Sequence, residues 1–317
     1  MSARRSPPFR ADHVGSLLRP AALLEARRQQ AEGAIGAPDL RRVEDDAVRS
    51  VVAMQRDVGL QSATDGELRR SSWHMDFIYQ LRGVTKSTEA LAIHFRNDAG
   101  GLEFTPAALR VEGRVGLDHT IFGDDFAFLQ SVAEDATCKL TIPSPSMVHY
   151  RGGRASVDEA VYPDMDAFWD DLSAAYGEQI AALGRMGCTY LQLDDTSLAY
   201  LNDPAQRAGL VERGDDASGQ HLRYIRQINA ALRSKPETMA VTTHLCRGNF
   251  RSSWAAEGGY DFVAEALFGE LAVDGFFLEF DDERSGSFAP LRFVPPGKQV
   301  VLGLVTTKRG ELESADA

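Results

Sequence analysis

The chain is poor in cysteine, with three residues among 317, at positions 138, 188 and 246. Three scattered thiols are too few for a disulfide framework, and their scarcity is typical of a reducing compartment. No apolar run approaches the roughly 20 residues that a membrane helix needs. The first residues, MSARRSPPFRAD, also lack the apolar stretch of a signal peptide. We therefore expect a cytoplasmic protein that has no membrane partner.

Positive charge is also scarce, because 34 Lys and Arg residues face 46 Asp and Glu residues, giving a formal net charge of -12. This balance argues against a nucleic acid as a general partner. The chain also has no linker long enough to divide it convincingly. With 44% hydrophobic residues it is expected to build one substantial core. We therefore predict a single domain over residues 1–317.

What the chain does contain is an alternation of two kinds of segment. Short apolar or β-branched runs indicate eight strands, at 9–17, 59–66, 108–115, 137–143, 189–194, 239–245, 275–280 and 299–306. Helical patterns separate most of them, at 20–32 with 37–58, 71–82, 124–134, 164–186, 217–234 and 255–272. This order predicts parallel β-α units closed into an α/β, (β/α)8 TIM barrel.

The predicted barrel has one alternative fold and one irregularity, at its last helix. A doubly wound open sheet is the alternative fold, but the first loop, HVGSLLRP, has one glycine and no glycine-rich phosphate motif. The eighth strand is followed only by RGELESADA, which is too short for a complete outer helix. We therefore expect a barrel that lacks its last helix, either by truncation or because it closes in another way.

The carboxyl ends of barrel strands carry the chemistry in this fold, and six of the eight predicted ends are polar. The sixth is THLCRG, in which His244 and Cys246 leave the same face of an extended chain. An imidazole and a thiolate favour Zn²⁺, and Glu279 at the end of the seventh strand offers a third ligand. The competing interpretation is a hydrogen-bonded core histidine beside a small buried thiol.

Acidic residues end two other predicted strands. In LQLDDTSL only one of the two adjacent acids can face the barrel centre, and Asp194 is the better placed to hold a substrate ammonium group. Asp195 or the following threonine is then free to cap a helix. In TDGELRR the second strand ends at Glu67, a further candidate acid for binding a ligand.

Six motifs, in order along nearly the whole chain, resemble the catalytic barrel of the cobalamin-independent methionine synthases, and more closely their short single-barrel relatives. They are ADHVGSLLRP, TDGELRRSSW, LQLDDTSLAYL, TTHLCRGNF, FFLEFDDERSG and VVLGLVTTK. The resemblance implies zinc-dependent methyl transfer to the thiol of homocysteine, from methyltetrahydrofolate or methylcobalamin. A corrinoid protein is the macromolecular partner implied if the donor is a corrinoid.

The resemblance also implies roles for individual residues. His244, Cys246 and Glu279 fall on three zinc ligands of the family, and the fourth, a cysteine beyond the eighth strand, has no counterpart here. The implied substrate-binding residues are Val14, Gly15, Ser16, Glu67 and Asp194 for the amino acid, and Tyr150 beside the methyl donor. The family's proton-donating histidine is replaced by Lys308. Lys308 and His74 are the catalytic candidates, with Asp281 and Asp282 as further choices for the acid.

Two other functions remain open from the sequence. One is a related zinc-thiolate alkyltransferase that acts on another thiol, of the coenzyme M type. Retention of Glu67 and Asp194 argues instead for an amino-acid thiol. The other is a truncated, non-catalytic barrel that binds a ligand without turnover. Stoichiometric zinc that is lost on substitution of His244 or Cys246 would separate the enzymes from this last alternative.

Overall fold

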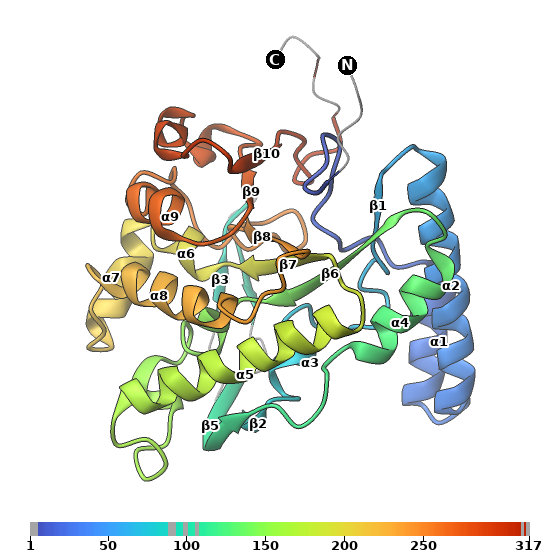
Figure 1. The fold of residues 1–317 in the computed structure, drawn as a ribbon, viewed down its shortest axis with the longest axis horizontal. Helices are drawn as coiled ribbons and strands as arrows, with labels where there is room; N and C mark the ends of the chain where they lie inside the picture. The colour runs from blue at the N-terminus through green and yellow to red at the C-terminus, as the bar shows by residue number, and fades with distance from the viewer. Residues whose placement is uncertain (1–5, 88–92, 98–100, 105–107, 312–313, 315–317) are drawn as a thin grey trace.

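The computed structural model describes residues 6–87, 93–97, 101–104, 108–311 and 314. A parallel sheet, in the order β1-β6-β7-β8-β9-β10, curls through the centre of the molecule (Figure 1). Its strands are β1 (Ser62–Ala63), β6 (Thr137–Pro143), β7 (Tyr190–Asp195), β8 (Ala240–Leu245), β9 (Gly275–Glu279) and β10 (Gln299–Gly303). Because these strands are parallel, their carboxyl ends meet at one edge, where the polar residues gather.

Helices alternate with these strands and cover the outside of the sheet (Figure 1). They are α1 (Ala21–Ala31), α2 (Ala37–Asp57), α3 (Met75–Ile78), α4 (Gly123–Val132), α5 (Met165–Arg185), α6 (Ser197–Tyr200), α7 (Pro204–Glu212), α8 (Gln220–Leu232) and α9 (Ala264–Glu270). Short 3₁₀ turns η1 (Pro145–Val148), η2 (Gly153–Ser156), η3 (Glu283–Ser285) and η4 (Ala289–Phe293) complete the connections. No helix in the described ranges is both long enough and apolar enough to cross a membrane.

Helix α5 illustrates why the local sequence folds as it does. The carboxylate of Asp164 caps its first turn by accepting a hydrogen bond from the backbone N–H of Asp166. Its apolar residues recur on one face and are buried, among them Phe168, Leu172 and Leu183. This helix confirms the prediction for 164–186, and α2, α4 and α8 also lie where their patterns indicate.

The segment 9–17, predicted as the first strand, is not a strand in the structure. Its carbonyl groups are bound by side chains instead of by a neighbouring backbone: Gln192 Nε2 donates to Val14 O at 2.6 Å, and Thr64 Oγ1 to Gly15 O at 2.7 Å. Figure 1 shows it, in dark blue, between β1 and the β9–β10 end of the sheet. It thus lies where a further barrel strand was expected, without joining the ladder.

The run 108–115 is a strand, but not one of the parallel sheet. It forms β5 (Ala108–Gly116), which pairs antiparallel with β2 (Arg82–Ser87), and beside this hairpin β3 (Ile93–Phe95) pairs with β4 (Leu102–Phe104). Charged residues alternate along β5, at Arg110, Glu112 and Arg114. Such alternation suits a two-stranded sheet with one solvated face, whereas strands buried on both faces are continuously apolar. The predicted helices 71–82 and 255–272 are also shorter, as α3 and α9.

The end of the chain was expected to lack a complete last helix. Residues 304–311, which follow β10, contain no helix. Residues 312–313 and 315–317 lie outside the described residues.

Gly15 holds the N-terminal segment against the sheet. Its φ is +128°, and a Cβ built there would lie 2.7 Å from Thr141 Cγ2 on β6. Gly15→Ala is therefore expected to destabilise the protein by about 1–3 kcal/mol, since it adds both a strained backbone conformation and a clash. Urea unfolding should show a lower midpoint with an unchanged m-value.

Gly209 in α7 offers the matched control for that substitution. A Cβ there meets nothing within 4 Å, and the residue is helical. Gly209→Ala is expected to leave stability unchanged or raise it by up to about 1 kcal/mol. Equal effects of the two substitutions would contradict a specific role of Gly15.

Candidate functional site

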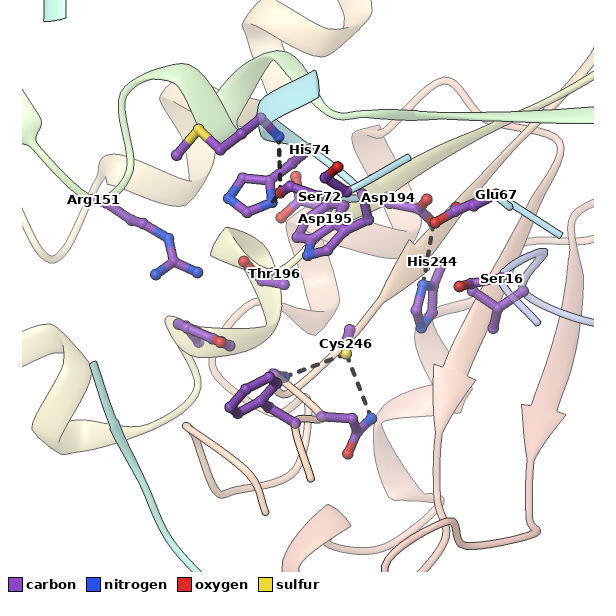
Figure 2. A pocket seen from close by; sticks show the side chains of 18 of the residues that line it. Ser16, Glu67, Ser72, His74, Arg151, Asp194, Asp195, Thr196, His244 and Cys246 are labelled. Carbon is purple, nitrogen blue, oxygen red and sulfur yellow. Dashed lines mark hydrogen bonds and ion pairs between the residues drawn. The ribbon is translucent and has the colours of Figure 1, made fainter. Parts of the chain in front are cut away.

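A cavity of about 540 Å³ opens at the carboxyl ends of the parallel strands. Figure 2 shows side chains from many separate segments pointing into it. The lining residues include most of those predicted from the sequence: Val14, Ser16, Glu67, His74, Asp194, His244 and Cys246. Segments far apart in the chain therefore meet at one polar site, as the strand-end pattern indicated.

His244 and Asp194 are held together by the register of two neighbouring strands. They are paired residues of β8 and β7, and Nδ1 of His244 bonds Oδ1 of Asp194 at 3.2 Å. The same Oδ1 accepts a hydrogen bond from Gln192 Nε2 at 2.7 Å. An imidazole whose Nδ1 is fixed by a carboxylate presents Nε2 as a ligand, an arrangement common around protein-bound metals.

Cys246 follows β8 and has its sulfur on the cavity wall. The backbone N–H of Gly248 and Nδ2 of Asn249 donate to Sγ at 3.3 and 3.5 Å. Burial raises the pKa of the thiol to about 11, and the nearby Glu279 carboxylate adds to this shift. The thiol is therefore protonated near neutral pH in the unliganded protein, although two N–H donors are already aimed at the sulfur.

Glu279 ends β9, next to Cys246, because Leu245 pairs with Leu278 one residue earlier. Its carboxylate does not line the cavity: Lys308 Nζ donates to Oε1 at 2.7 Å, and the backbone N–H of Arg247 to Oε2 at 3.1 Å. Lys308 also donates to Asp281 Oδ2 at 2.6 Å. Lys308 is thus tied to two carboxylates and is likewise absent from the cavity lining.

The side-chain types of His244, Cys246 and Glu279 suit a zinc ion, but the three side chains are not yet grouped around one point. A thiol, an imidazole and a carboxylate are ligands that Zn²⁺ prefers. Within the described ranges, however, no three His, Cys, Asp or Glu side chains are grouped closely enough to hold a metal ion. His244 and Cys246 face the cavity, so a three-ligand site would require Glu279 to release Lys308.

Glu67 lies in the turn after β1 and is nearly fully buried. Its φ of +56° is unusual for a residue other than glycine, and such strain often marks functional positions. Oε1 accepts from Thr141 Oγ1 at 2.7 Å, whereas Oε2 is shielded from solvent and has no partner among the described residues. Burial raises the pKa of Glu67 and the neighbouring Asp194 adds to the shift, whereas Arg70, 3.4 Å from Oε1, opposes it. Two buried acids side by side favour a cationic ligand group.

His74, at the start of α3, is almost completely buried. Burial and the positive charge of Arg151 lower its pKa to about 3. Its Nδ1 lies 3.2 Å from Ser72 Oγ, and its Nε2 has no partner among the described residues. The ring is therefore neutral at neutral pH, and a role as general acid requires bound substrates to raise this pKa.

Two other predicted residues support the cavity without lining it. Gly15 lies between Val14 and Ser16 and brings both to the wall. Tyr150 is buried, with its ring packed edge-on against Tyr200, and its hydroxyl donates to Gln206 Oε1 at 3.1 Å. The residue that reaches the cavity from this loop is its neighbour, Arg151.

Sequence reasoning missed several lining residues, most of which come from loops: Arg19, Trp73, Arg151, Tyr200, Asn249 and Phe250. Arginines in loops are usually solvated, so nothing in HYRGG distinguishes Arg151 from a surface residue. Arg19 had a weak signal, since it lies in the motif ADHVGSLLRP, which also carries Val14 and Ser16.

Comparison with known proteins identifies several relatives. The chain is 43% identical over 315 residues to the uncharacterized protein YxjH of Bacillus subtilis, covering 99% of this chain and 81% of that protein. A Listeria monocytogenes structure, provisionally identified as a vitamin-B12-independent methionine synthase, matches with a TM-score of 0.78 and 38% identity, over 98% of this chain and 85% of that one. A methionine synthase of Pyrococcus furiosus is 24% identical over 305 residues, 96% of this chain and 77% of that protein. No protein-family model matches the sequence.

The fold and the site define an α/β barrel protein of the TIM type with a polar cavity at the carboxyl ends of its strands. The fold class predicted from the sequence is thereby confirmed. The chain belongs to the family of vitamin-B12-independent methionine synthases, as its motifs indicated.

Proposed function

We propose that this protein is a zinc-dependent methyltransferase that moves a methyl group from 5-methyltetrahydrofolate or methylcobalamin to the thiol of homocysteine, giving methionine. The whole of residues 1–317 would then form one catalytic barrel. The observation that carries the proposal is the convergence of His244, Cys246, Asp194 and Glu67 on one cavity in a member of this family. The names of its relatives point to the same reaction.

Zinc would bind His244, Cys246 and Glu279 and would lower the pKa of the substrate thiol, so that the thiolate is present at neutral pH. His244 is already oriented for this by Asp194. Cys246 would lose its proton on binding the ion, assisted by the N–H groups of Gly248 and Asn249. Glu279 would exchange Lys308 for the ion.

The two buried acids would bind the amino group of homocysteine. Glu67 offers an unpartnered oxygen, Oε2, and Asp194 faces the same cavity. An ammonium ion between them would compensate their charge, and the sulfur at the other end would be fixed for attack on the donor methyl group. Ser16 lines the same part of the cavity and can donate a hydrogen bond to the amino-acid backbone.

The sulfur–methyl bond forms as the bond between the methyl group and its donor breaks, and the electron pair of that bond leaves with the donor. If the leaving atom is N5 of a tetrahydrofolate, it must take up a proton. His74 and Lys308 remain the proposed sources, His74 from the cavity wall and Lys308 once it has left Glu279. A corrinoid donor would need no such acid.

The test is methionine formation by zinc-loaded protein with homocysteine and each donor supplied separately, followed by mass spectrometry. We expect methionine from one donor, and none after removal of the metal by a chelator. Zinc content measured before the assay gives the stoichiometry, expected to be one ion per chain. Fully loaded protein that forms no methionine from either donor would contradict the proposal, and protein that takes up no zinc would favour a non-catalytic barrel.

A further inference from the structure

We propose that Arg151 binds a carboxylate of the methyl donor and thereby favours an acidic donor, a folate. The inference rests on the proposed function, because it concerns the second substrate of the same cavity. Arg151 lies just beyond η1, in the loop that follows β6, and its side chain lines the cavity on the side of His74 (Figure 2).

The guanidinium of Arg151 is buried and uncompensated. Its Nε and Nη1 are shielded from solvent, and neither has a hydrogen-bond partner among the described residues. The groups whose charge would act on it are the hydroxyls of Tyr150 and Tyr200, but burial raises the pKa of both tyrosines, so they are neutral near neutral pH. Burying a charge without a partner costs several kcal/mol, so this arrangement calls for an anion from outside the chain.

Other buried arginines of the protein are compensated. Arg247 donates to the carbonyl oxygens of Gly258, Glu279 and Ser285. Arg70 donates to Thr141 and lies 3.4 Å from Glu67 Oε1. The fold therefore supplies partners where an arginine is structural, and it supplies none for Nε and Nη1 of Arg151.

The two aspartates on the cavity wall have other partners, and Glu67 lies on the side of the cavity away from Arg151 (Figure 2). Asp195 accepts hydrogen bonds from Ser146 Oγ at 2.6 Å, Ser197 Oγ at 2.8 Å and the backbone N–H of Leu198 at 2.8 Å. Asp194 is bound by Gln192 and His244. Neither carboxylate can turn to Arg151 without leaving these donors unpaired, which is itself costly.

The position of Arg151 indicates that the anion it binds belongs to the methyl donor and not to homocysteine. Figure 2 draws Ser16, Glu67 and His244 together on one side and Arg151 on the other, beyond His74 and Thr196. The amino acid, with its ammonium at Glu67 and Asp194, keeps its own carboxylate within two bonds of that ammonium. A cavity of about 540 Å³ has room for a second, larger molecule. Tetrahydrofolates carry a glutamate with free carboxylates, whereas the only anionic group of methylcobalamin outside its ring is the phosphodiester of the nucleotide loop.

The test is calorimetric titration of the protein with two probes. One is 5-methyltetrahydrofolate, and the other is 5,6-dimethyltetrahydropterin, which keeps the reduced ring and the N5 methyl group but has neither the p-aminobenzoyl group nor a carboxylate. Wild-type protein should bind the folate at least about 10-fold more tightly than the pterin. Arg151→Gln should lower that ratio about 10- to 100-fold by weakening folate binding alone, the change expected for loss of one charge-assisted pair, because the p-aminobenzoyl group contributes equally in both proteins. Arg151→Lys should show a smaller loss.

Arg226→Gln is the matched control, since it removes the same charge from an exposed position on α8 and should change neither affinity. Equal folate affinities of Arg151→Gln and wild type, or a wild type that binds the two probes equally or binds no folate, would overturn the proposal. If Arg151→Gln weakened homocysteine binding instead, the anion at Arg151 would be the carboxylate of homocysteine, and the proposal would be overturned as well.

Thermal unfolding of the unliganded variants separates binding from folding. Arg151→Gln removes an unpaired buried charge, so its Tm should equal or exceed that of wild type. A fall of several degrees in both Arg151→Gln and Arg151→Lys would show a structural role and overturn the proposal. Because these measurements need no turnover, they stand apart from the methionine assay: failure of that assay does not change the ratio of the two probe affinities.

Discussion

Replacing Cys246 by serine is expected to abolish stoichiometric zinc binding and to lower kcat/KM for methionine formation by about 10³-fold or more, a loss of ~4 kcal/mol of transition-state stabilisation. The hydroxyl of serine is a far weaker ligand for Zn²⁺ than a thiolate. The geometry leaves no substitute, because Glu279 is itself one of the three proposed ligands and no other cysteine lines the cavity. Zinc content by mass spectrometry and initial rates at several homocysteine concentrations measure the two effects.

Cys138→Ser is the matched control for this substitution. Cys138 lies on β6, paired with Ala63 of β1 and away from the cavity lining, and burial raises the pKa of its thiol to about 11, as at Cys246. The control variant should keep its zinc and its rate. Retention of one zinc ion and full activity by Cys246→Ser would contradict the proposed metal site, whatever the control shows.

The barrel could be predicted from the sequence where short apolar or β-branched runs are separated by helical patterns. YLQLDD and AVTTHL are of this kind, and β7 and β8 lie as expected. The segment 9–17 could not be assigned in this way, because it lies between β1 and the β9–β10 end of the sheet and has its carbonyl groups bound by the side chains of Gln192 and Thr64. Local patterns do not distinguish such a segment from a strand. The charged alternation in β5 was a usable signal against a barrel strand.

The candidate site could be predicted to the extent that it lies on strand ends. His244 and Asp194 are placed by register alone, since β7 and β8 pair residue by residue, and Cys246 follows directly after the last pair. The hydrogen bond that holds the Glu279 carboxylate outside the cavity could not be predicted, because its donor, Lys308, is 29 residues away and reaches it from a loop. Arg151 was missed for a similar reason: whether an arginine is solvated or enclosed depends on the residues that close over it, here His74 and Tyr200 from two other segments.

Arg247→Met is expected to lower the free energy of unfolding by about 3–5 kcal/mol, a large effect for one substitution. The arginine is 1% exposed, and its guanidinium stacks 4.5 Å from the centre of the Tyr260 ring. It donates to Gly258 O at 3.0 Å and Glu279 O at 2.8 Å, and methionine of similar length fills the space without replacing these donors. Gly258 O then loses this donor, and Glu279 O keeps only the long hydrogen bond from Tyr260 Oη at 3.4 Å, so that both are poorly satisfied. Urea unfolding followed by circular dichroism measures the change.

Arg226→Met, on the exposed side of α8, controls for the loss of one positive charge and should alter stability by no more than about 0.5 kcal/mol. A loss below about 1 kcal/mol in Arg247→Met would mean that water or a shifted backbone satisfies the freed carbonyl groups.

Arg247 and Arg151 differ in where their hydrogen-bond partners come from. Both side chains are arginines at the same end of the barrel, yet the fold binds one with its own carbonyl groups and leaves the other for a ligand. Substitution of Arg247 should lower the free energy of unfolding and leave the ratio of folate to pterin affinity unchanged. Substitution of Arg151 should lower that ratio and leave the free energy of unfolding unchanged or higher.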